Sequence, residues 1–383
     1  MNVDWTKSFF NVGRASSVQF GGIPCCKENI CSEISIDIAL ICEGGVLHFF
    51  DLNAAEYCQW DVASQEYIAR KNIDVYGATM LLYADGIVFL GDQALDRNSV
   101  EVKFDLTKVF EGNKYERRGR MFYWGDSELS TDGDACYLNN KIYRIIDCND
   151  VSKGLIEIDT QTWQFDRVDY PFLTIEPGVD GLIIGNTEHE IGAFKLGEGI
   201  QWKYEVEKDS NYSMEHGLSF ALFDDRIIIT TRQGDIICLN QSDGSLIWQS
   251  SISELINYDW VSNPSRLSAP TINGKVAIIE NFLERKVVFT VDLTDGRLLW
   301  TRDINLINGC IAGDLFFTSE KSKDTPPIAL DCYTGEIVWQ ADEPFEDAYQ
   351  VIASGKYVIY LSTYFNGYVF EWETPYISPH RPA

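Results

Sequence analysis

The sequence Asp331-Cys-Tyr-Thr-Gly335-Glu-Ile-Val-Trp339 predicts the fold of the protein, because its pattern recurs along the chain. Asn240–Trp248 and Asp292–Trp300 repeat it: a glycine follows the first Asp or Asn by four residues, and a tryptophan follows it by eight. A polar residue followed by a glycine that tolerates positive φ indicates a tight hairpin between two strands. A tryptophan at one fixed place in each copy indicates a side chain that packs between neighbouring sheets.

Weaker copies extend this pattern to most of the chain. The anchor residues expected to end one strand of each copy are Asp51, Asp105, Asp159, Lys195, Asn240, Asp292, Asp331 and Glu371. A second hairpin precedes each anchor strand, as in Leu81–Phe89 and Pro270–Ile278, so each unit has four short strands. Four strands in a repeat of about 40 to 50 residues predict the blades of a β-propeller.

We therefore expect an all-β chain that forms a single domain over residues 1–383, an eight-bladed β-propeller with four antiparallel strands in each blade. The last unit has only three strands, because residues 374–383 contain three prolines and form an irregular tail. Val3–Lys7, within a closing strand at residues 1–10, is expected to pair with the last blade, which closes the ring and removes a sheet edge. Seven blades is the alternative, because the expected inner strand of the first blade, near Ser16–Phe20, is separated from the rest by a cysteine-bearing stretch.

At these residues the chain resembles a known family. The Asp-x-x-Thr-Gly-x-x-x-Trp pattern of Asp331–Trp339 is similar to the PQQ-like repeat of quinoprotein-type β-propellers. The resemblance implies an eight-bladed ring in which the tryptophans dock between blades. It does not imply one function, because the ring serves quinone- and Ca²⁺-dependent dehydrogenases as well as binding scaffolds. Some of those dehydrogenases have a disulfide between adjacent cysteines; Cys25-Cys26 is similar but lies at the start of the chain, where the family's pair is not expected.

The residues do not form a recognisable catalytic or metal-binding motif. Cys25, Cys26 and Cys31 lie in a stretch that resembles a loop and lack the paired CxxC spacing of a zinc site. The four histidines lie in no HExxH or nucleophile-elbow context. We expect no catalytic residue, no metal site and no cofactor, which leaves binding as the class of function.

The charge of the chain restricts its partners. It has 58 acidic and 31 basic residues, a net charge of −27, which excludes nucleic acid and an anionic membrane surface as main partners because they carry the same sign. No stretch has the roughly 18 apolar residues that span a bilayer, and the first residues lack the pattern of a signal peptide. We therefore expect a cytoplasmic protein with free thiols, most of them in apolar strands.

The lengths of the links between strands predict where a partner binds. In a four-stranded blade, the links between the first two strands and between the last two lie on one face, and all other links lie on the opposite face. The first class is short, as at Asp85-Gly86 and Asn273-Gly274, whereas the second is long, as at Gly91–Ser99 and Asp147–Gly154. Long loops on a rigid scaffold commonly carry function.

The links between blades combine aromatic with acidic side chains, and Trp and Tyr are favoured in interfaces. The residues expected to bind a partner are Trp124, Asp126, Glu128, Tyr212, Glu215, Tyr258, Asp259, Trp260, Phe345, Glu346, Asp347 and Tyr349. We expect a non-enzymatic propeller, monomeric before it binds its partner, that binds a basic protein; its most concrete form is an immunity protein that neutralises a toxin or effector domain. The alternatives are a general assembly scaffold and a PQQ-dependent oxidoreductase.

Overall fold

The computed structural model describes most of the chain, with gaps in the loops. The described residues are 17–18, 24–29, 38–42, 45–51, 55–64, 66–73, 81–84, 86–90, 93–105, 115–118, 121–124, 127–130, 135–148, 151–187, 189–206, 218–231, 233–256, 267–268, 270–281, 287–304, 309–319, 325–342, 348–354, 357–362, 367–372 and 376–381. Their secondary structure is almost entirely β-strand, with one turn of 3₁₀ helix, η1 (Val179–Gly181), and one short helix, α2 (Ile252–Ile256).

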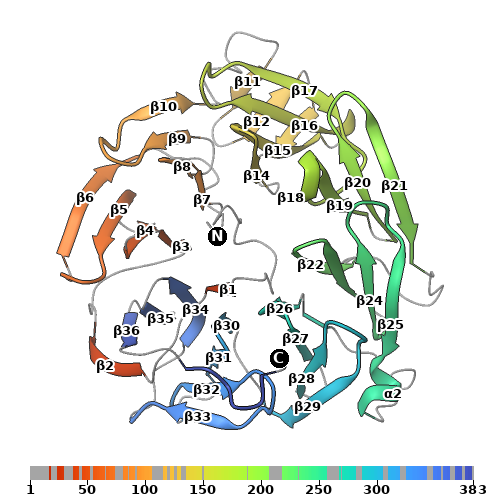
Figure 1. Cartoon of the computed structure of the whole chain (residues 1–383). Coiled ribbons are helices and arrows are strands. Elements are labelled where there is room, and N and C mark those ends of the chain that lie inside the picture. The colour runs from red at the N-terminus through yellow and green to blue at the C-terminus, as the bar shows by residue number, and fades with distance from the viewer. Residues whose placement is uncertain are drawn as a thin grey trace.

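The strands form eight sheets arranged around a ring, so the expected eight-bladed propeller is confirmed (Figure 1). Blade 1 contains β3 (Ile38–Cys42), β4 (Val46–Asp51), β5 (Glu56–Asp61) and β6 (Glu66–Asn72), and blade 2 contains β7 (Leu81–Ala84), β8 (Ile87–Leu90), β9 (Gln93–Asp96) and β10 (Val102–Asp105). Blade 3 contains β14 (Ala135–Leu138), β15 (Lys141–Cys148), β16 (Val151–Asp159) and β17 (Phe165–Asp169). Blade 4 contains β18 (Glu176–Pro177), β19 (Ile183–Asn186), β20 (Glu190–Lys195) and β21 (Gly199–Glu205).

Blades 5 to 8 complete the ring. Blade 5 contains β22 (Ser219–Phe223), β23 (Arg226–Thr230), β24 (Asp235–Asn240) and β25 (Leu246–Ser251), and blade 6 contains β26 (Thr271–Ile272), β27 (Val276–Asn281), β28 (Val287–Asp292) and β29 (Leu298–Asp303). Blade 7 contains β30 (Cys310–Ala312), β31 (Leu315–Thr318), β32 (Ile328–Asp331) and β33 (Ile337–Gln340). Blade 8 contains β34 (Ala348–Ser354), β35 (Tyr357–Ser362), β36 (Gly367–Trp372) and β2 (Pro24–Asn29).

The ring is closed by a strand from the N-terminal part of the chain, as expected, but from a different segment. β2 pairs antiparallel with β36, with Pro24 opposite Trp372 and Lys27 opposite Val369. Val3–Lys7, the expected closing strand, lies outside the described residues. Cys25 and Cys26 therefore belong to the outer strand of blade 8, so their expected position in a loop is wrong.

A second short strand precedes the closing strand. β1 (Ser17–Val18) pairs in parallel with β30, the inner strand of blade 7. The expectation that this segment is the inner strand of blade 1 is therefore wrong, because β3 has that place.

The turns that follow the third strands share one geometry. The carbonyls of Asp292 and Asp331 accept the backbone N–H of Gly296 and Gly335 at 2.9 and 2.8 Å, and each aspartate side chain also accepts a backbone N–H within its own turn. Both glycines have φ values of +74° and +70°, which L-residues with a Cβ adopt only under strain.

Two expected anchors in the first half of the chain are wrong. Asp51 ends the second strand of blade 1 and Asp105 ends the outer strand of blade 2. The equivalent turns follow Asp61 and Asp96, whose side chains accept backbone N–H groups within them. Gly91–Ser99 is accordingly not a long link, because it contains β9.

Each described docking tryptophan joins its blade to the next. The indole Nε1 atoms of Trp202, Trp248 and Trp300 donate to backbone carbonyls of the following blade, each at 2.9 Å. Blades 2 and 3 are joined by a different aromatic pair, in which Phe104 stacks on Trp163 with the ring centroids 5.5 Å apart. Trp163 takes the place of the turn glycine, and its φ is +56°.

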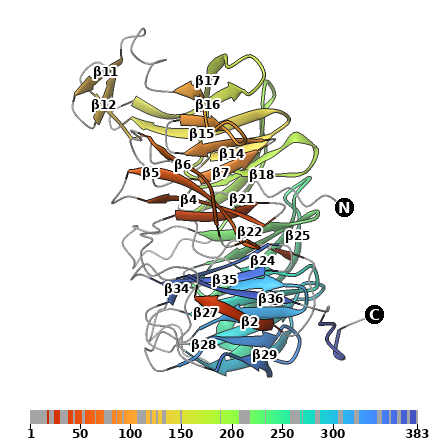
Figure 2. The ribbon, with the colours of Figure 1, turned by 90° about the vertical axis from the view of Figure 1, so that its left-hand side faces the viewer.

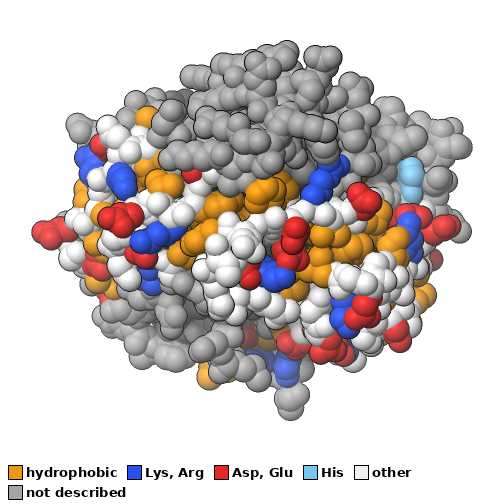
Figure 3. Space-filling model, turned by 90° about the horizontal axis from the view of Figure 1, so that it is seen from above, with side chains coloured by type: hydrophobic (Ala, Val, Ile, Leu, Met, Phe, Trp, Pro, Cys, Tyr) orange, Lys and Arg blue, Asp and Glu red, His pale blue; other side chains and the backbone are white. Residues whose placement is uncertain are grey.

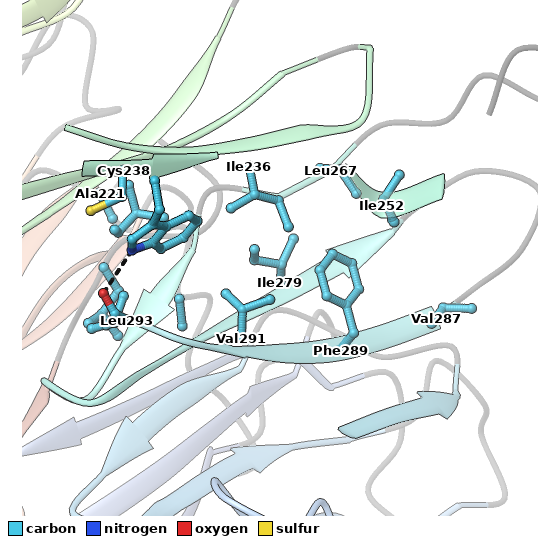
Figure 4. Close-up of a cluster of buried hydrophobic side chains, with 14 residues drawn as sticks. Ala221, Ile236, Cys238, Ile252, Leu267, Ile279, Val287, Phe289, Val291 and Leu293 are labelled. Atoms are coloured by element: carbon cyan, nitrogen blue, oxygen red, sulfur yellow. Dashed lines mark hydrogen bonds between the residues drawn. The ribbon is translucent and has the colours of Figure 1, made fainter. Parts of the chain in front are cut away.

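The core consists of apolar side chains packed between neighbouring blades. Between blades 5 and 6, Ile236 of one sheet faces Ile279 and Phe289 of the next (Figure 4). Burial of such side chains stabilises the fold by about 2 kcal/mol each. On the rim, hydrophobic side chains lie exposed between charged ones (Figure 3).

Candidate functional site

The two faces of the ring differ in their links. We call the face with the links from the first to the second and from the third to the fourth strand the tight-turn face, and the opposite one the loop face. In Figure 2 the loop face lies at the left and the tight-turn face at the right. β15 and β16 pair up to Cys148 opposite Val151, so the loop-face link expected over Asp147–Gly154 is short.

The expected binding residues belong to four connections between an outer strand and the next inner strand, which begin and end at the loop face. Three of them lie on described strands, where the structure describes the backbone alone: Trp124, Glu128 and Tyr349. Asp126, Tyr212, Glu215, Tyr258, Asp259, Trp260, Phe345, Glu346 and Asp347 lie outside the described residues. The proposed binding face therefore stays a prediction at the level of side chains.

The first of these connections is a sheet extension rather than a simple loop. β11 (Tyr115–Arg118), β12 (Met121–Trp124) and β13 (Ser127–Ser130) pair antiparallel in sequence, and β13 continues onto β15 of blade 3. In Figure 2 this extension projects beyond the ring at the left. The register places Tyr123 opposite Glu128, so an aromatic and an acidic residue are cross-strand neighbours there.

Sequence reasoning missed this extension because its sequence signal is weak. Of the three strands only β12, with the sequence MFYW, is rich in strand-forming residues, whereas β11 (YERR) and β13 (SELS) consist mostly of charged or polar residues. These strands also do not follow the four-strand repeat of the blades.

Buried polar side chains lie beneath the loop face and join consecutive blades. Each lies at or next to the end of a second strand and reaches the start of the next blade. Asn186 donates to the carbonyl of Leu218 at 3.0 Å, and the Thr230 hydroxyl donates to the carbonyl of Ser268 at 2.8 Å. These hydrogen bonds fix the start of each of these blades relative to the second strand of the preceding blade.

Glu280 makes a third hydrogen bond of this kind between blades, but its side chain is an acid that can titrate, unlike Asn186 and Thr230. Burial raises the pKa of its carboxyl to about 8, and the backbone N–H of Gly309 in blade 7, which donates to it, partly opposes that shift. The carboxyl is therefore largely protonated at neutral pH. Sequence reasoning missed this residue as a buried group, because an acid next to a loop normally faces water.

Five cysteines whose side chains the structure describes are core residues. Cys58, Cys136, Cys238, Cys310 and Cys332 are buried, and burial raises the pKa of Cys58 and of Cys238 to about 12. Cys31 lies outside the described residues. Within the described ranges, no three His, Cys, Asp or Glu side chains lie together as a metal site. No helix in those ranges has the length and apolar character needed to cross a membrane.

The comparisons with known proteins agree with the repeat pattern. Residues 200–341, about two fifths of the chain, match the sequence profile of the family described as outer membrane protein assembly factor BamB. None of the curated proteins matched this sequence.

Solved structures of several kinds share the fold. BamB from Moraxella catarrhalis is 12% identical, covers 93% of this chain and 100% of its own, and has a TM-score of 0.56. The quinohemoprotein alcohol dehydrogenase of Comamonas testosteroni is 11% identical, with a TM-score of 0.61 over 99% of this chain and 82% of its own. The computationally designed protein Ika8 is 10% identical, with a TM-score of 0.61 over 92% of this chain and 100% of its own. At these identities the likeness shows the fold, and the group contains an enzyme and an assembly factor.

Proposed function

Because this chain is an eight-bladed β-propeller of PQQ-like repeats, we propose that it is a non-enzymatic protein that binds a basic partner protein on its loop face. The observation that carries the proposal is the net charge of −27 on a rigid ring whose longer connections meet at one face. A field of this sign attracts a basic surface, and aromatic side chains in the connections then become buried in the contact. An assembly factor with the same fold supports protein binding as the class of function.

The most concrete form of this proposal is an immunity protein of the cytoplasm that neutralises a basic toxin or effector domain. Its loop face would cover the toxin's functional surface, and steering by opposite charges would make capture fast. A general assembly scaffold is the broader form, in which the partner is a component of a larger complex. Toxicity of the isolated partner separates the two.

A quinoprotein oxidoreductase is the alternative from a different class, because the alcohol dehydrogenase shares the fold over nearly the whole chain. Such an enzyme holds a Ca²⁺ ion next to its quinone, and hard oxygen ligands must converge on that ion. Within the described ranges no three His, Cys, Asp or Glu side chains lie together as such a site. We place binding before catalysis because of the acidic charge of the chain and the aromatic and acidic residues expected in the connections of the loop face.

The test is affinity capture from native cytosol at low and at moderate salt, followed by mass spectrometry. We expect one basic protein in near-equal amount, and we expect Asp259→Lys with Glu346→Lys to weaken its capture more than tenfold. The matched control is Asp225→Lys with Asp295→Lys, which makes the same charge change on exposed side chains of the tight-turn face. Equal loss in both double variants would show that net charge alone drives capture.

The captured partner is then expressed alone and together with this protein. Toxicity that co-expression removes supports the immunity protein, whereas a harmless partner supports the scaffold. Uptake of Ca²⁺ and a quinone by the purified protein, with dye reduction in the presence of an alcohol, would overturn the proposal in favour of the enzyme.

A further inference from the structure

Residues 376–381 lie on the tight-turn face and dock against blade 7, although they follow the last strand of blade 8. Figure 1 shows this end of the chain in front of blades 6 and 7. The segment is irregular, as its sequence predicts. Ser378 is buried, and Tyr376 packs against the hydrophobic cluster shared by blades 7 and 8.

Two aspartates in the turns of blade 7 hold the segment. The Tyr376 hydroxyl donates to Oδ2 of Asp331 at 2.7 Å. The backbone N–H of Ser378 donates to Oδ2 of Asp314 at 3.0 Å, and the Arg381 guanidinium lies 3.7 Å from the same oxygen. The segment thus offers a hydroxyl, a backbone N–H and a cation to two carboxylates.

Asp314 is the centre of this site. Its side chain is 5% exposed, and its other oxygen accepts the Tyr333 hydroxyl at 3.2 Å. A buried carboxylate needs donors, because its desolvation is costly when they are missing. Without the docked segment, Asp314 would lose an N–H and a guanidinium from its surroundings.

The equivalent turn of blade 5 shows that this burial is not a property of every blade. There the carbonyl of Asp225 accepts the backbone N–H of Gln241, as the carbonyl of Asp314 accepts that of Cys332. The side chain of Asp225 is 69% exposed, however. In blade 7 the docked segment and Tyr333, whose place in blade 5 is taken by Ser242, together cover the acid.

The segment has the character of a bound peptide rather than of a core element. Ile377 is 65% exposed and Arg381 is also exposed, so the outer side of the segment faces water. Its polar contacts are to side chains of the two turns, and it pairs with none of the described strands. A second peptide with the same donors would satisfy the two aspartates equally well.

We propose that the turns of blade 7 around Asp314 and Asp331 form a peptide-binding site, which residues 376–381 occupy in cis. The site accepts a segment of another protein that presents a tyrosine hydroxyl, a backbone N–H two residues later and an arginine five residues later. The negative charge of the whole chain favours such a basic segment. The site lies on the face opposite the loop face, so a test of this site does not depend on whether the proposed function is correct.

The test uses the full chain with its own segment loosened by Tyr376→Phe and Arg381→Gln. A fluorescent peptide with the sequence of residues 374–383 is titrated into the wild-type protein and into the loosened variant, and anisotropy is measured up to millimolar concentration. That range matches the effective concentration of a tethered segment. Circular dichroism and thermal unfolding check that each variant is folded.

We expect the loosened variant to bind the peptide at least tenfold more tightly than the wild-type protein, whose site is occupied. Asp314→Asn in the loosened variant should reduce binding at least tenfold. A peptide with Tyr376→Phe and Arg381→Gln tests the same contacts without any change in the protein, and should also bind at least tenfold more weakly. Binding to neither protein, equal binding to both, or indifference to the peptide's own substitutions would overturn the proposal.

Discussion

The indole of Trp248 lies against Gly296 of the following blade so closely that a Cβ atom on this glycine would be 2.5 Å from Cε3 of the ring. The same indole donates its N–H to the carbonyl of Leu293, in the turn that Gly296 ends. Gly335 stands in the same relation to Trp300. The glycine of the repeat thus serves two purposes, because it has a positive φ and it leaves room for the neighbouring blade's tryptophan.

Gly296→Ala should therefore destabilise the protein more than an alanine at a glycine with strain alone. Gly197 is the matched control, since its φ is +76° and no atom lies within 4 Å of its would-be Cβ. We expect Gly197→Ala to cost about 1 kcal/mol from the left-handed backbone, and Gly296→Ala about 3 kcal/mol, because overpacking against Trp248 adds to the strain. Urea unfolding midpoints measure both, and equal costs would refute the packing argument.

The closing strand β2 can be tested by proline substitution. Lys27→Pro removes a backbone N–H from the strand that pairs with β36 and should destabilise the ring by about 3 kcal/mol or more. Thr6→Pro, in the segment that the sequence alone suggests for closure, should leave the thermal unfolding temperature unchanged. A larger effect of Thr6→Pro than of Lys27→Pro would assign closure to residues 1–10 instead.

Glu280 should make the protein less stable as the pH rises. The pKa of its buried carboxyl is raised to about 8, against 4.5 for an exposed one, because burial disfavours the charged form. Between these two values the folded chain holds a proton that the unfolded chain has released, so the free energy of unfolding falls as pH increases. We expect a loss of a few kcal/mol across this window.

Glu280→Gln removes this titration while keeping a group that can accept the N–H of Gly309. Relative to wild type, the variant should gain stability between pH 5 and pH 9, as measured by denaturant unfolding at several pH values. Parallel pH profiles of the two proteins would show that Glu280 is not the titrating group.

His48 should have the opposite effect at acid pH. Burial and the nearby positive charge of Arg97 lower the pKa of the His48 imidazole to about 3, and its Nδ1 shares a hydrogen bond with the Tyr57 hydroxyl. Its contribution to stability is present above pH 6.5 and is lost as the pH falls toward 3, because the unfolded chain then binds a proton that the folded chain does not.

His48→Gln cannot bind that proton, so its unfolding free energy should fall less steeply than that of wild type between pH 6.5 and pH 4. The difference between the two profiles isolates His48 from the carboxylates, which titrate in both proteins. A variant with the same slope as wild type would exclude His48 as a source of acid sensitivity.

The repeat could be predicted where one residue type meets two requirements at once. At Gly296 and Gly335, positive φ and close approach of an indole both demand glycine, so the pattern is visible in the sequence. In blades 2 and 3 the corresponding residues are Val100 and Trp163, which adopt positive φ despite their side chains. The turn after Asp96 was missed, whereas the turn after Asp159 was predicted from its strand alone, because packing across blades replaces the glycine signal in both.

The candidate site could be predicted only as a face. Alternating strand directions determine which links meet, so the sequence places the expected partner-binding residues on one side of the ring. The extension β11–β13 was missed because it lies outside the repeat. Buried acids such as Glu280 were also missed, since burial depends on the neighbouring blade and not on the residue type.

Turn residues and strand alternation act over a few positions, so the four-stranded blades and their ring could be predicted from the sequence. The closure of the ring by Pro24–Asn29 could not, since many short strands are compatible with the edge of β36. The burial of Asp314 beneath residues 376–381, while the equivalent Asp225 faces water, is likewise known only from the folded chain. Both outcomes depend on contacts between segments far apart in the chain, which no local pattern encodes.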